Sequence, residues 1–394
     1  MSIADRWLLP DGVNEILPPE AWRVERQRRL LLDLFHSWGY DLVMPPLVEF
    51  LESLLTGTGN DLDLNTFKVT DQLTGRLMGL RADTTPQVAR IDAHSLNHQM
   101  PTRLCYANSV LHTRAANMLA SRTPLQIGAE LYGHAGVESD IEVICLMLET
   151  LRHAGIDNLT LDLGHVAFYR ALVDEAGLEP DQQSELFNLL QGKALTEYNA
   201  LLERLSLDAP LLEKLRALPA LNGDQAVLAR AQALFGAGKG AVAEALADLE
   251  RIADTVSRRF PGVALYFDLS ELRGYNYHTG VVFAAFTPGY GQPLAKGGRY
   301  DEIGKVFGRA RPATGFSADL KVIVEQAPRV ENQPRAILAP LDKDPGLGDE
   351  VARLRGAGER VLYALPGQET LDAEDLGCDR RLVQRDGHWR VVPF

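Results

Sequence analysis

The chain has 394 residues, 46% of them hydrophobic and 24% charged, an ordinary globular composition that excludes disordered, collagen-like and small disulfide-stapled classes. With 40 Lys and Arg against 53 Asp and Glu, the net charge is −13, which argues against a general nucleic-acid binder. The cysteines Cys105, Cys145 and Cys378 lie far apart without a C-x-x-C pair, so a reducing, cytoplasmic location is expected. Neither a secretory signal nor a membrane span of roughly 18 apolar residues is predicted.

The first third of the chain predicts helices, an extended segment and a hairpin. A long helix follows Pro18-Pro19 because proline is tolerated in a first helical turn, and Gly39 ends it. Pro45 and Pro46 place the next apolar run at a sheet edge or an interface rather than in a central strand. The predicted elements are a helix from Glu20 to Trp38, an extended segment from Tyr40 to Phe50, a hairpin of Thr66 to Val69 with Arg76 to Leu80, and a helix from Thr84 to His94.

The middle of the chain predicts further strands around a block of helices. Ser139 to Glu142 has the S-x-x-E pattern of a capping box, which predicts the start of an apolar helix that stops at Gly155. From about Val166 to Arg259 the sequence is helical, with loop signals between Ala- and Leu-rich stretches. Strands are predicted at Leu104 to Leu111, Leu125 to Tyr132, Leu159 to Leu163, Val263 to Leu269, Val281 to Phe286 and Pro293 to Gly297, and a helix from Gly315 to Val324.

These elements divide the chain into three parts. A helical insertion, residues 166–259, splits a core formed by residues 1–165 and 260–325. The polar segment from Glu325 to Asn332 contains Pro328 and is a candidate linker. Residues 330–394 then form a small α/β domain with a last hairpin turning at Asp386-Gly387. This domain carries nine Lys and Arg against twelve Asp and Glu, so we expect it to have no basic face.

Polar residues inside strand-like stretches are the candidates for a binding site, because burying them is unfavourable unless a partner or ligand satisfies them. Gln126 and Glu130 point to the same side of one strand, where they can line the floor of a pocket. On these residues alone, a solvent-facing strand side is an equal alternative, as is a plain bulge or turn at Gly297-Gly298. The other candidate stretches are Arg81 to Pro86, Arg273 to His278 and Gly297 to Asp301.

The order of these motifs resembles the core of histidyl-tRNA synthetase over about Pro10 to Val324. The two histidine-specific signatures of that family are similar to the last two candidate stretches and lie in the right order around a strand hairpin. The resemblance implies an α+β fold of the class II aminoacyl-tRNA synthetase type, an antiparallel sheet flanked by helices, in a dimer. The matching segments are Gly39 to Pro46, with Tyr40 to Pro46 at the dimer interface, Leu80 to Asp83, Arg103 to Gly133, Leu272 to Tyr277, Lys296 to Asp301 and Gly315-Phe316.

The chain departs from these synthetases at two positions that handle ATP. The arginine that holds the α-phosphate and the substrate carboxylate is matched by His112, and the arginine that stacks on adenine is matched by Val322. Neither side chain supplies the planar, always-charged fork that both tasks need, and losing one such group lowers a rate by roughly a hundredfold. We therefore expect no adenylate chemistry. The C-terminal domain is shorter than the family's anticodon-binding domain and net acidic, so no tRNA binding is expected.

The amino-acid pocket, by the same resemblance, is kept. Asp83 stands where the family has a Glu that receives the α-ammonium group, and Arg273 is placed to hold the ligand carboxylate. A cationic amino group favours carboxylates, while an imidazole offers one donor and one acceptor that tyrosine hydroxyls and a carboxylate can meet. The predicted histidine-binding residues are Asp83, Thr85, Gln126, Glu130, Arg273, Tyr277 and Tyr300.

A synthetase-like chain that keeps a histidine pocket but lacks the ATP arginines resembles the regulatory subunits of ATP phosphoribosyltransferase, the first enzyme of histidine biosynthesis. This resemblance implies a non-catalytic protein that dimerises through its core, joins a short-form catalytic subunit in a hetero-oligomer and mediates feedback by L-histidine, bound in the pocket or at a subunit interface. No cofactor is implied, and no metal site is predicted because His94 and His98 lack a third ligand. A divergent histidyl-tRNA synthetase and a stand-alone histidine-binding or tRNA-binding paralogue stay open as alternatives.

Overall fold

A computed structural model describes residues 7–55, 60–115, 117, 120–236, 240–272, 274–275, 277–329, 335–368 and 375–394. The chain divides into two compact units, a core unit, Met1–Ala327, and a C-terminal unit, Pro328–Phe394. Among the described residues, no helix has the length and apolar character needed to cross a membrane. The predicted linker begins inside a helix, α12 (Leu320–Gln326), and its last residues, 330–332, lie outside the described part.

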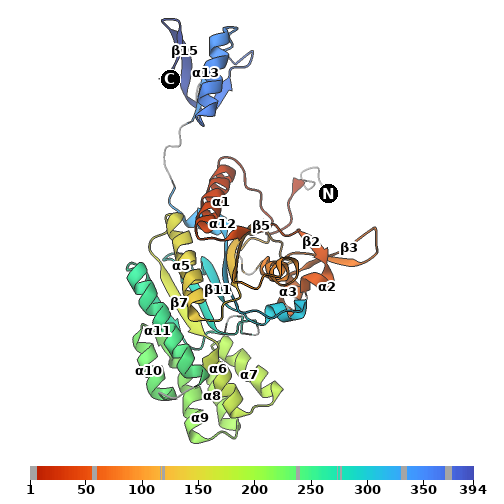
Figure 1. The fold of residues 1–394 in the computed structure, drawn as a ribbon, viewed down its shortest axis with the longest axis vertical. Helices are drawn as coiled ribbons and strands as arrows, with labels where there is room; N and C mark the ends of the chain where they lie inside the picture. The colour runs from red at the N-terminus through yellow and green to blue at the C-terminus, as the bar shows by residue number, and fades with distance from the viewer. Residues whose placement is uncertain are drawn as a thin grey trace. The chain divides into compact units, whose positions relative to one another are not determined.

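A nine-stranded sheet forms the centre of the core unit (Figure 1). Its strands lie in the order β1 (Asp41–Leu42), β5 (Thr102–Ser109), β6 (Leu125–Tyr132), β12 (Ala313–Asp319), β11 (Ala295–Arg299), β10 (Val281–Phe286), β7 (Thr160–His165), β9 (Ala264–Asp268) and β8 (Asn222–Gly223). Neighbours from β5 to β7 pair antiparallel, whereas β1 pairs with β5 and β9 with β7 in parallel. The predicted α+β class, an antiparallel sheet flanked by helices, is confirmed.

Side chains along β6 alternate between two differently covered faces of the sheet, as the two-residue period of a strand requires. Ile127, Ala129 and Leu131 are fully buried in the main hydrophobic core, to which helices α1 (Glu20–Ser37) and α5 (Val137–His153) contribute. The intervening residues Gln126 and Glu130 project from the opposite face. One face of the sheet is therefore the packing face, and the other is available to build a site.

Helix α5 begins two residues before the predicted capping box. Its N-cap is Gly136, and the Ser139 hydroxyl donates to the carbonyl oxygens of His134 and Gly136, at 3.1 and 2.7 Å, instead of accepting from a free backbone N–H. The capping-box prediction is therefore wrong. Ser139 is buried and accepts from Arg299 Nη2 at 2.8 Å, so its polar group fixes α5 against β11 rather than opening the helix.

Helices fill the chain between β7 and β9, because two parallel strands need a crossover connection. Figure 1 shows them, in yellow to green, gathered at one end of the core unit. The last of them packs on α5 through an apolar face that includes Leu249, Ile252 and Val256, which joins the insertion to the packing face. Their bounds are α6 (Ala167–Ala176), α7 (Pro180–Gln191), α8 (Leu195–Arg204), α9 (Ala209–Ala217), α10 (Ala226–Phe235) and α11 (Ala241–Arg259).

A small three-stranded sheet leads into the segment that contains Asp83 and Thr85. Arg81 is 5% exposed, and its guanidinium donates to the carbonyl oxygens of Ser109 and Pro45 at 2.8 and 2.7 Å. Arg81 therefore holds this segment against the end of β5. The elements here are β2 (Val48–Phe50), β4 (Leu77–Leu80) and β3 (Phe67–Thr70), with the short helices α2 (Leu51–Leu55), α3 (Asn60–Asn65) and α4 (Thr85–Arg90) and a π-helical turn, Ile91–Leu96.

The segment from Gly315 to Val324, predicted as a helix, is a strand in its first half. Strand β12 runs to Asp319, and helix α12 follows with the Asp319 carboxylate accepting from the Lys321 N–H at 3.0 Å. The helix prediction was wrong here because long-range packing overrides local pattern. A Cβ on Gly315 would lie 1.6 Å from Glu130 Oε2, so this glycine is needed where the strand crosses the Glu130 carboxyl.

The described part of the C-terminal unit is a four-stranded sheet with one helix. Its strands lie in the order β14 (Val361–Tyr363), β13 (Ala336–Ala339), β15 (Cys378–Arg385) and β16 (His388–Pro393), and the helix is α13 (Pro345–Gly356). The predicted hairpin turn at Asp386-Gly387 is confirmed. Both turn residues have positive φ, 51° and 73°, as the tight turns between twisted antiparallel strands require.

Gly315→Ala should destabilise the core unit, since the added methyl group would occupy the space of the Glu130 carboxyl. We expect the free energy of unfolding to fall by on the order of 2 kcal/mol in chemical denaturation. Gly262→Ala is the matched control, because a Cβ at Gly262 meets nothing within 4 Å. Equal unfolding midpoints for the two variants would contradict the steric role of Gly315.

Candidate functional site

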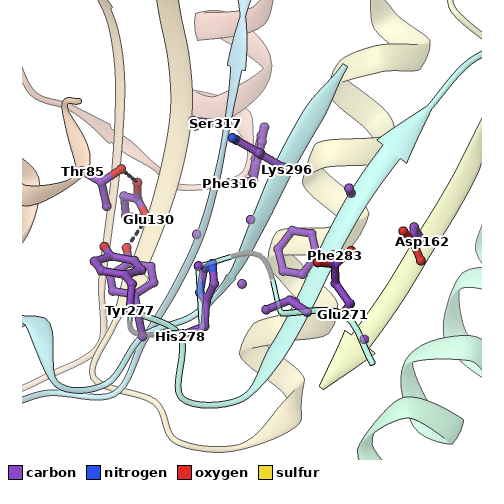
Figure 2. Close-up of a pocket in the computed structure, with 18 of the residues that line it drawn as sticks. Thr85, Glu130, Asp162, Glu271, Tyr277, His278, Phe283, Lys296, Phe316 and Ser317 are labelled. Atoms are coloured by element: carbon purple, nitrogen blue, oxygen red, sulfur yellow. Dashed lines mark hydrogen bonds between the residues drawn. The ribbon is translucent and has the colours of Figure 1, made fainter. Parts of the chain in front are cut away.

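A cavity of about 200 Å³ opens on the Glu130 face of the central sheet. Figure 2 shows Thr85, Glu130 and Tyr277 at one end of the cavity and Asp162 and Glu271 at the other. The sheet face that the alternation of β6 leaves uncovered by α1 and α5 is thus hollowed rather than flat, and carboxylates lie at both ends of the hollow.

Most of the predicted histidine-binding residues come together in this cavity. The lining includes five of the seven, namely Asp83, Thr85, Glu130, Tyr277 and Tyr300. Gln126 lies behind Asp83 and is joined to it by a hydrogen bond. Arg273 lies outside the described residues.

Glu130 is a buried carboxyl of the site that accepts three hydrogen bonds from hydroxyl groups. It is 1% exposed, and its Oε1 accepts from the hydroxyls of Tyr106 at 3.0 Å and Thr85 at 3.2 Å. The Tyr300 hydroxyl donates to Oε2. Four chain segments therefore converge on one side chain: β5, β6, the start of α4 and the residue after β11.

Burial sets the protonation of Glu130. Removal from water raises the pKa of this carboxyl to about 8, against the opposing effect of the Tyr300 and Tyr106 hydroxyls, and the nearby Asp83 carboxylate raises it further. At neutral pH Glu130 is therefore largely a neutral acid. A ligand that brings a positive charge or a hydrogen-bond donor to the carboxyl would favour its ionised form.

Asp83 is held in the lining of the cavity by a short chain of hydrogen bonds. Its Oδ1 accepts from the Thr85 N–H and from Gln126 Nε2, both at 2.9 Å, while Gln126 Oε1 accepts from the Thr84 N–H at 2.9 Å. Gln126 thus orients Asp83, and both bonds fall on a single carboxylate oxygen. Because Asp83 also lines the cavity, it is positioned to meet a cationic group there.

Tyr277 forms an aromatic wall of the cavity. Its ring stacks on that of Tyr300 with centroids 5.0 Å apart and an interplanar angle of 26°. The Tyr277 hydroxyl is buried and has no hydrogen-bond partner among the described residues. A buried hydroxyl without a partner is unfavourable, so this atom is a place where a bound ligand would gain a hydrogen bond.

Glycines hollow the cavity. A Cβ on Gly297 would lie 2.1 Å from the Gly315 carbonyl oxygen, and a Cβ on Gly298 would lie 2.8 Å from the His278 ring. Burial lowers the pKa of His278 to about 4, so its imidazole is neutral, and one ring nitrogen faces the Arg299 carbonyl oxygen at 3.3 Å.

The Gly297-Gly298 pair lies in the regular strand β11, where both residues pair in register with β12. It is not the turn or bulge that stood as an alternative.

Arg299 of the same signature points away from the cavity. Its guanidinium forms a buried ion pair with Asp140 of α5 at 2.8 Å, with a second contact to Asp301 at 3.3 Å. Breaking a buried ion pair leaves an uncompensated charge in the interior, which is strongly unfavourable. The pair therefore holds β11 to helix α5 on the packing face. The signature therefore combines an anchor, Arg299, with a residue of the site, Tyr300.

The two positions that match the ATP arginines are used for packing. His112 Nε2 donates to the Ala82 carbonyl oxygen at 2.9 Å, which ties the loop after β5 to the residue before Asp83. Val322, in α12, packs against the main hydrophobic core. Neither side chain presents a positive fork, and no group of three or more His, Cys, Asp or Glu within the described part could hold a metal ion.

Sequence reasoning did not find Tyr106, whose hydroxyl donates to Glu130. Tyr106 lies opposite Gly128 in the β5–β6 pair, and the absence of a side chain at Gly128 makes room for the Tyr106 ring. Sequence reasoning also did not find Asp162, Glu271 and Lys296, which line the cavity. The signal for Tyr106 was a polar aromatic residue inside a strand, two positions from Leu104 on the same face.

The raised pKa of Glu130 predicts a pH dependence of stability. The folded chain keeps a proton on this carboxyl that the unfolded chain, with the usual value of 4.5, has released. Relative to Glu130→Gln, the free energy of unfolding of the wild-type chain should therefore fall between pH ~5 and ~8, by on the order of 1 kcal/mol per pH unit. Denaturant titrations across this range measure the difference, and parallel profiles would contradict it. The titration of groups that both proteins share cancels in this difference of unfolding free energies.

Comparison with known proteins agrees with this geometry. Residues 12–323 match the family model for histidyl-tRNA synthetase, and residues 334–392 match that for the ATP phosphoribosyltransferase subunit HisZ C-terminal domain. A Bacillus halodurans structure, described as an ATP phosphoribosyltransferase regulatory subunit/histidyl-tRNA synthetase, has a TM-score of 0.84 at 28% identity over 97% of this chain and 99% of that chain. A histidyl-tRNA synthetase from Nostoc shares the fold, with a TM-score of 0.76 at 18% identity over 98% and 97%. The predicted class II synthetase-like fold is confirmed.

Relatives match over the full length of the chain. The identity is 58% to a protein of Thioalkalivibrio sulfidiphilus and 56% to one of Ectopseudomonas mendocina, with 100% of both chains covered in each case. Both are described as ATP phosphoribosyltransferase regulatory subunits. Together with the match of residues 334–392, this shows that the chain belongs to the family of ATP phosphoribosyltransferase regulatory subunits.

Proposed function

We propose that this chain acts as a non-catalytic regulatory subunit of ATP phosphoribosyltransferase, required for the first step of histidine biosynthesis, and that L-histidine exerts feedback by binding in the Glu130 cavity. The observation that carries the proposal is the hydrogen-bonded Glu130 carboxyl facing a cavity beside a buried tyrosine hydroxyl without a partner among the described residues. The Tyr277 hydroxyl would gain a hydrogen bond from a small ligand with hydrogen-bonding atoms on a compact ring or chain.

Histidine meets these groups with complementary atoms. Its α-ammonium group would bind the Asp83 carboxylate, which Gln126 and the Thr85 N–H already orient. Its imidazole offers one donor and one acceptor, which Glu130 and the Tyr277 hydroxyl can satisfy. Arg273 is proposed to hold the α-carboxylate. Thr85 and Tyr300 would act through Glu130, to which both donate.

The absence of catalysis is proposed from the two ATP positions. His112 uses Nε2 to hold the Ala82 carbonyl oxygen, and Val322 packs against the core, so neither replaces an arginine that spreads charge over a transferring phosphoryl group. No cofactor or tRNA takes part in the proposed function. A cytoplasmic location remains a prediction.

The proposed partners are a short-form catalytic subunit, in a hetero-oligomer, and a second copy of this chain. Homodimerisation is proposed through the extended segment from Tyr40 to Pro46. Support comes from Leu42 and Met44 within this segment and from Leu47 directly after it, which are 43%, 75% and 46% exposed. Exposed apolar patches of this kind mark protein contacts.

Phosphoribosyl transfer from phosphoribosyl pyrophosphate to ATP tests the proposal. We expect this chain to raise the rate of a short-form catalytic subunit, and L-histidine to reverse the activation, because feedback requires that histidine favour one state of the assembly. Asp83→Ala and Glu130→Gln should each raise the half-inhibitory histidine concentration about tenfold or more, since each removes a charged hydrogen bond.

The control for these variants is Glu197→Ala, which removes an exposed carboxylate on helix α8, outside the cavity. Its histidine response should equal that of the wild-type chain. No activation at saturating wild-type chain would overturn the regulatory role. Activation with histidine inhibition unchanged in Asp83→Ala would instead move histidine out of the Glu130 cavity.

Exchange of pyrophosphate into ATP tests the absence of adenylate chemistry. The wild-type chain should show no histidine-dependent exchange, because no arginine occupies the two ATP positions. The double variant His112→Arg with Val322→Arg should bind ATP more tightly by equilibrium dialysis, whereas His112→Gln, which adds no charge, should not. Detectable exchange by the wild-type chain would favour the divergent synthetase instead.

A further inference from the structure

The sheet of the C-terminal unit has one covered face. Ile337, Leu382 and Val391 pack with helix α13 in a small hydrophobic cluster. At the start of this helix, Asp344 Oδ2 accepts from Trp389 Nε1 at 2.8 Å and from Gln384 Nε2 at 3.0 Å. The strand positions that alternate with these residues therefore form the opposite face of the sheet.

This opposite face, which we call the outer sheet face, is defined by the pairing of the strands. One row across the sheet is formed by Leu362, Leu338, Arg381 and Val392, each the register partner of the next. Two further cross-strand pairs extend the face toward the hairpin turn. The outer sheet face consists of Leu338, Leu362, Arg381, Val383, Arg385, His388, Arg390 and Val392.

Charge on the outer sheet face has a single sign. It carries three arginines and a histidine but no Asp or Glu, although the whole chain has a net charge of −13. Arg381, Arg385 and Arg390 are exposed, and none forms an ion pair within the described residues, whereas Arg353 and Arg380 of the same unit pair with Glu350 and Glu359. The expectation that this unit has no basic face is therefore wrong, because a net charge hides how register sorts residues between two faces.

Apolar side chains occupy the rest of the outer sheet face. Leu338, Leu362, Val383 and Val392 are half-exposed between the arginines. Phe394 is 51% exposed at the chain end, with the Arg381 guanidinium over its ring at 5.4 Å from the centroid. Aliphatic groups interspersed with arginine are typical of the centre of protein–protein interfaces.

We infer that the outer sheet face docks on an acidic, partly apolar surface of the catalytic subunit, an inference that rests on the proposed function. Charge complementarity selects the partner's sign, since three arginines without carboxylates would gain ion pairs and direct approach. Protein is favoured over RNA because four of the eight residues of this face are aliphatic and offer bases no ring to stack on, namely Leu338, Leu362, Val383 and Val392. Residues 334–392 also match the model of the ATP phosphoribosyltransferase subunit HisZ C-terminal domain, whereas the match to the synthetase model ends at residue 323.

Calorimetric titration of the catalytic subunit with the full chain tests the inference. Arg385→Glu with Arg390→Glu should raise the dissociation constant about tenfold or more. The difference in affinity between the variant and the wild-type chain should become smaller at high salt, because salt screens the charges. Lys343→Glu with Arg353→Glu is the matched control, since it makes the same charge change at exposed positions of the same unit outside the outer sheet face. We expect this control to bind as the wild-type chain does.

The outcomes separate this inference from the proposed function. If the wild-type chain neither binds nor activates the catalytic subunit, the proposed function fails. If it does both and Arg385→Glu with Arg390→Glu binds equally well, the inference alone is overturned. A third outcome is that Arg385→Glu with Arg390→Glu binds the catalytic subunit as the wild-type chain does but no longer binds a single-stranded oligoribonucleotide that the wild-type chain binds. This outcome would assign the face to nucleic acid and overturn the inference. Equal weakening by the sheet-face and control variants would reduce the effect to net charge and also overturn the inference.

Discussion

The Glu130 carboxyl lies inside the central sheet, in a place where a charged group is unfavourable, and the neighbouring structure is arranged around it. Three hydroxyls, those of Thr85, Tyr106 and Tyr300, donate to it. The adjacent strand β12 passes at Gly315, where no side chain could fit. The fold thus holds a buried acid with a raised pKa in the lining of a cavity, and groups of this kind are candidates for functional sites.

Local pattern was sufficient for the parts of this site that lie on one strand or in one loop. The two-residue alternation placed Gln126 and Glu130 on one face of the sheet. The signature from Gly297 to Asp301 identified Tyr300, whose hydroxyl donates to Glu130. What local pattern could not supply was the register between strands distant in the chain. Tyr106 reaches Glu130 because its ring crosses Gly128 on the neighbouring strand. The helix prediction over Gly315 was wrong because this glycine is required by the close approach of the Glu130 carboxyl, which is distant in the sequence.

In the synthetase-like core, the two residues predicted to replace the ATP arginines serve packing. His112 and Val322 hold a loop and a helix in place, so restoring arginine there would remove packing contacts as well as add charge. The C-terminal unit shows a related limit of composition. Its acidic and basic residues nearly balance, yet strand pairing gathers arginines on one face, which only the register of β13, β15 and β16 makes visible.

Arg81 joins two regions to which separate roles have been given. Its guanidinium donates hydrogen bonds to the carbonyl oxygens of Pro45 and Ser109, and Asp83 follows it two residues later in the chain. Through these bonds Arg81 ties the segment proposed for dimerisation to the stretch that carries Asp83. In the proposed function, a ligand that binds Asp83 would therefore also restrain the segment that meets the second copy of the chain.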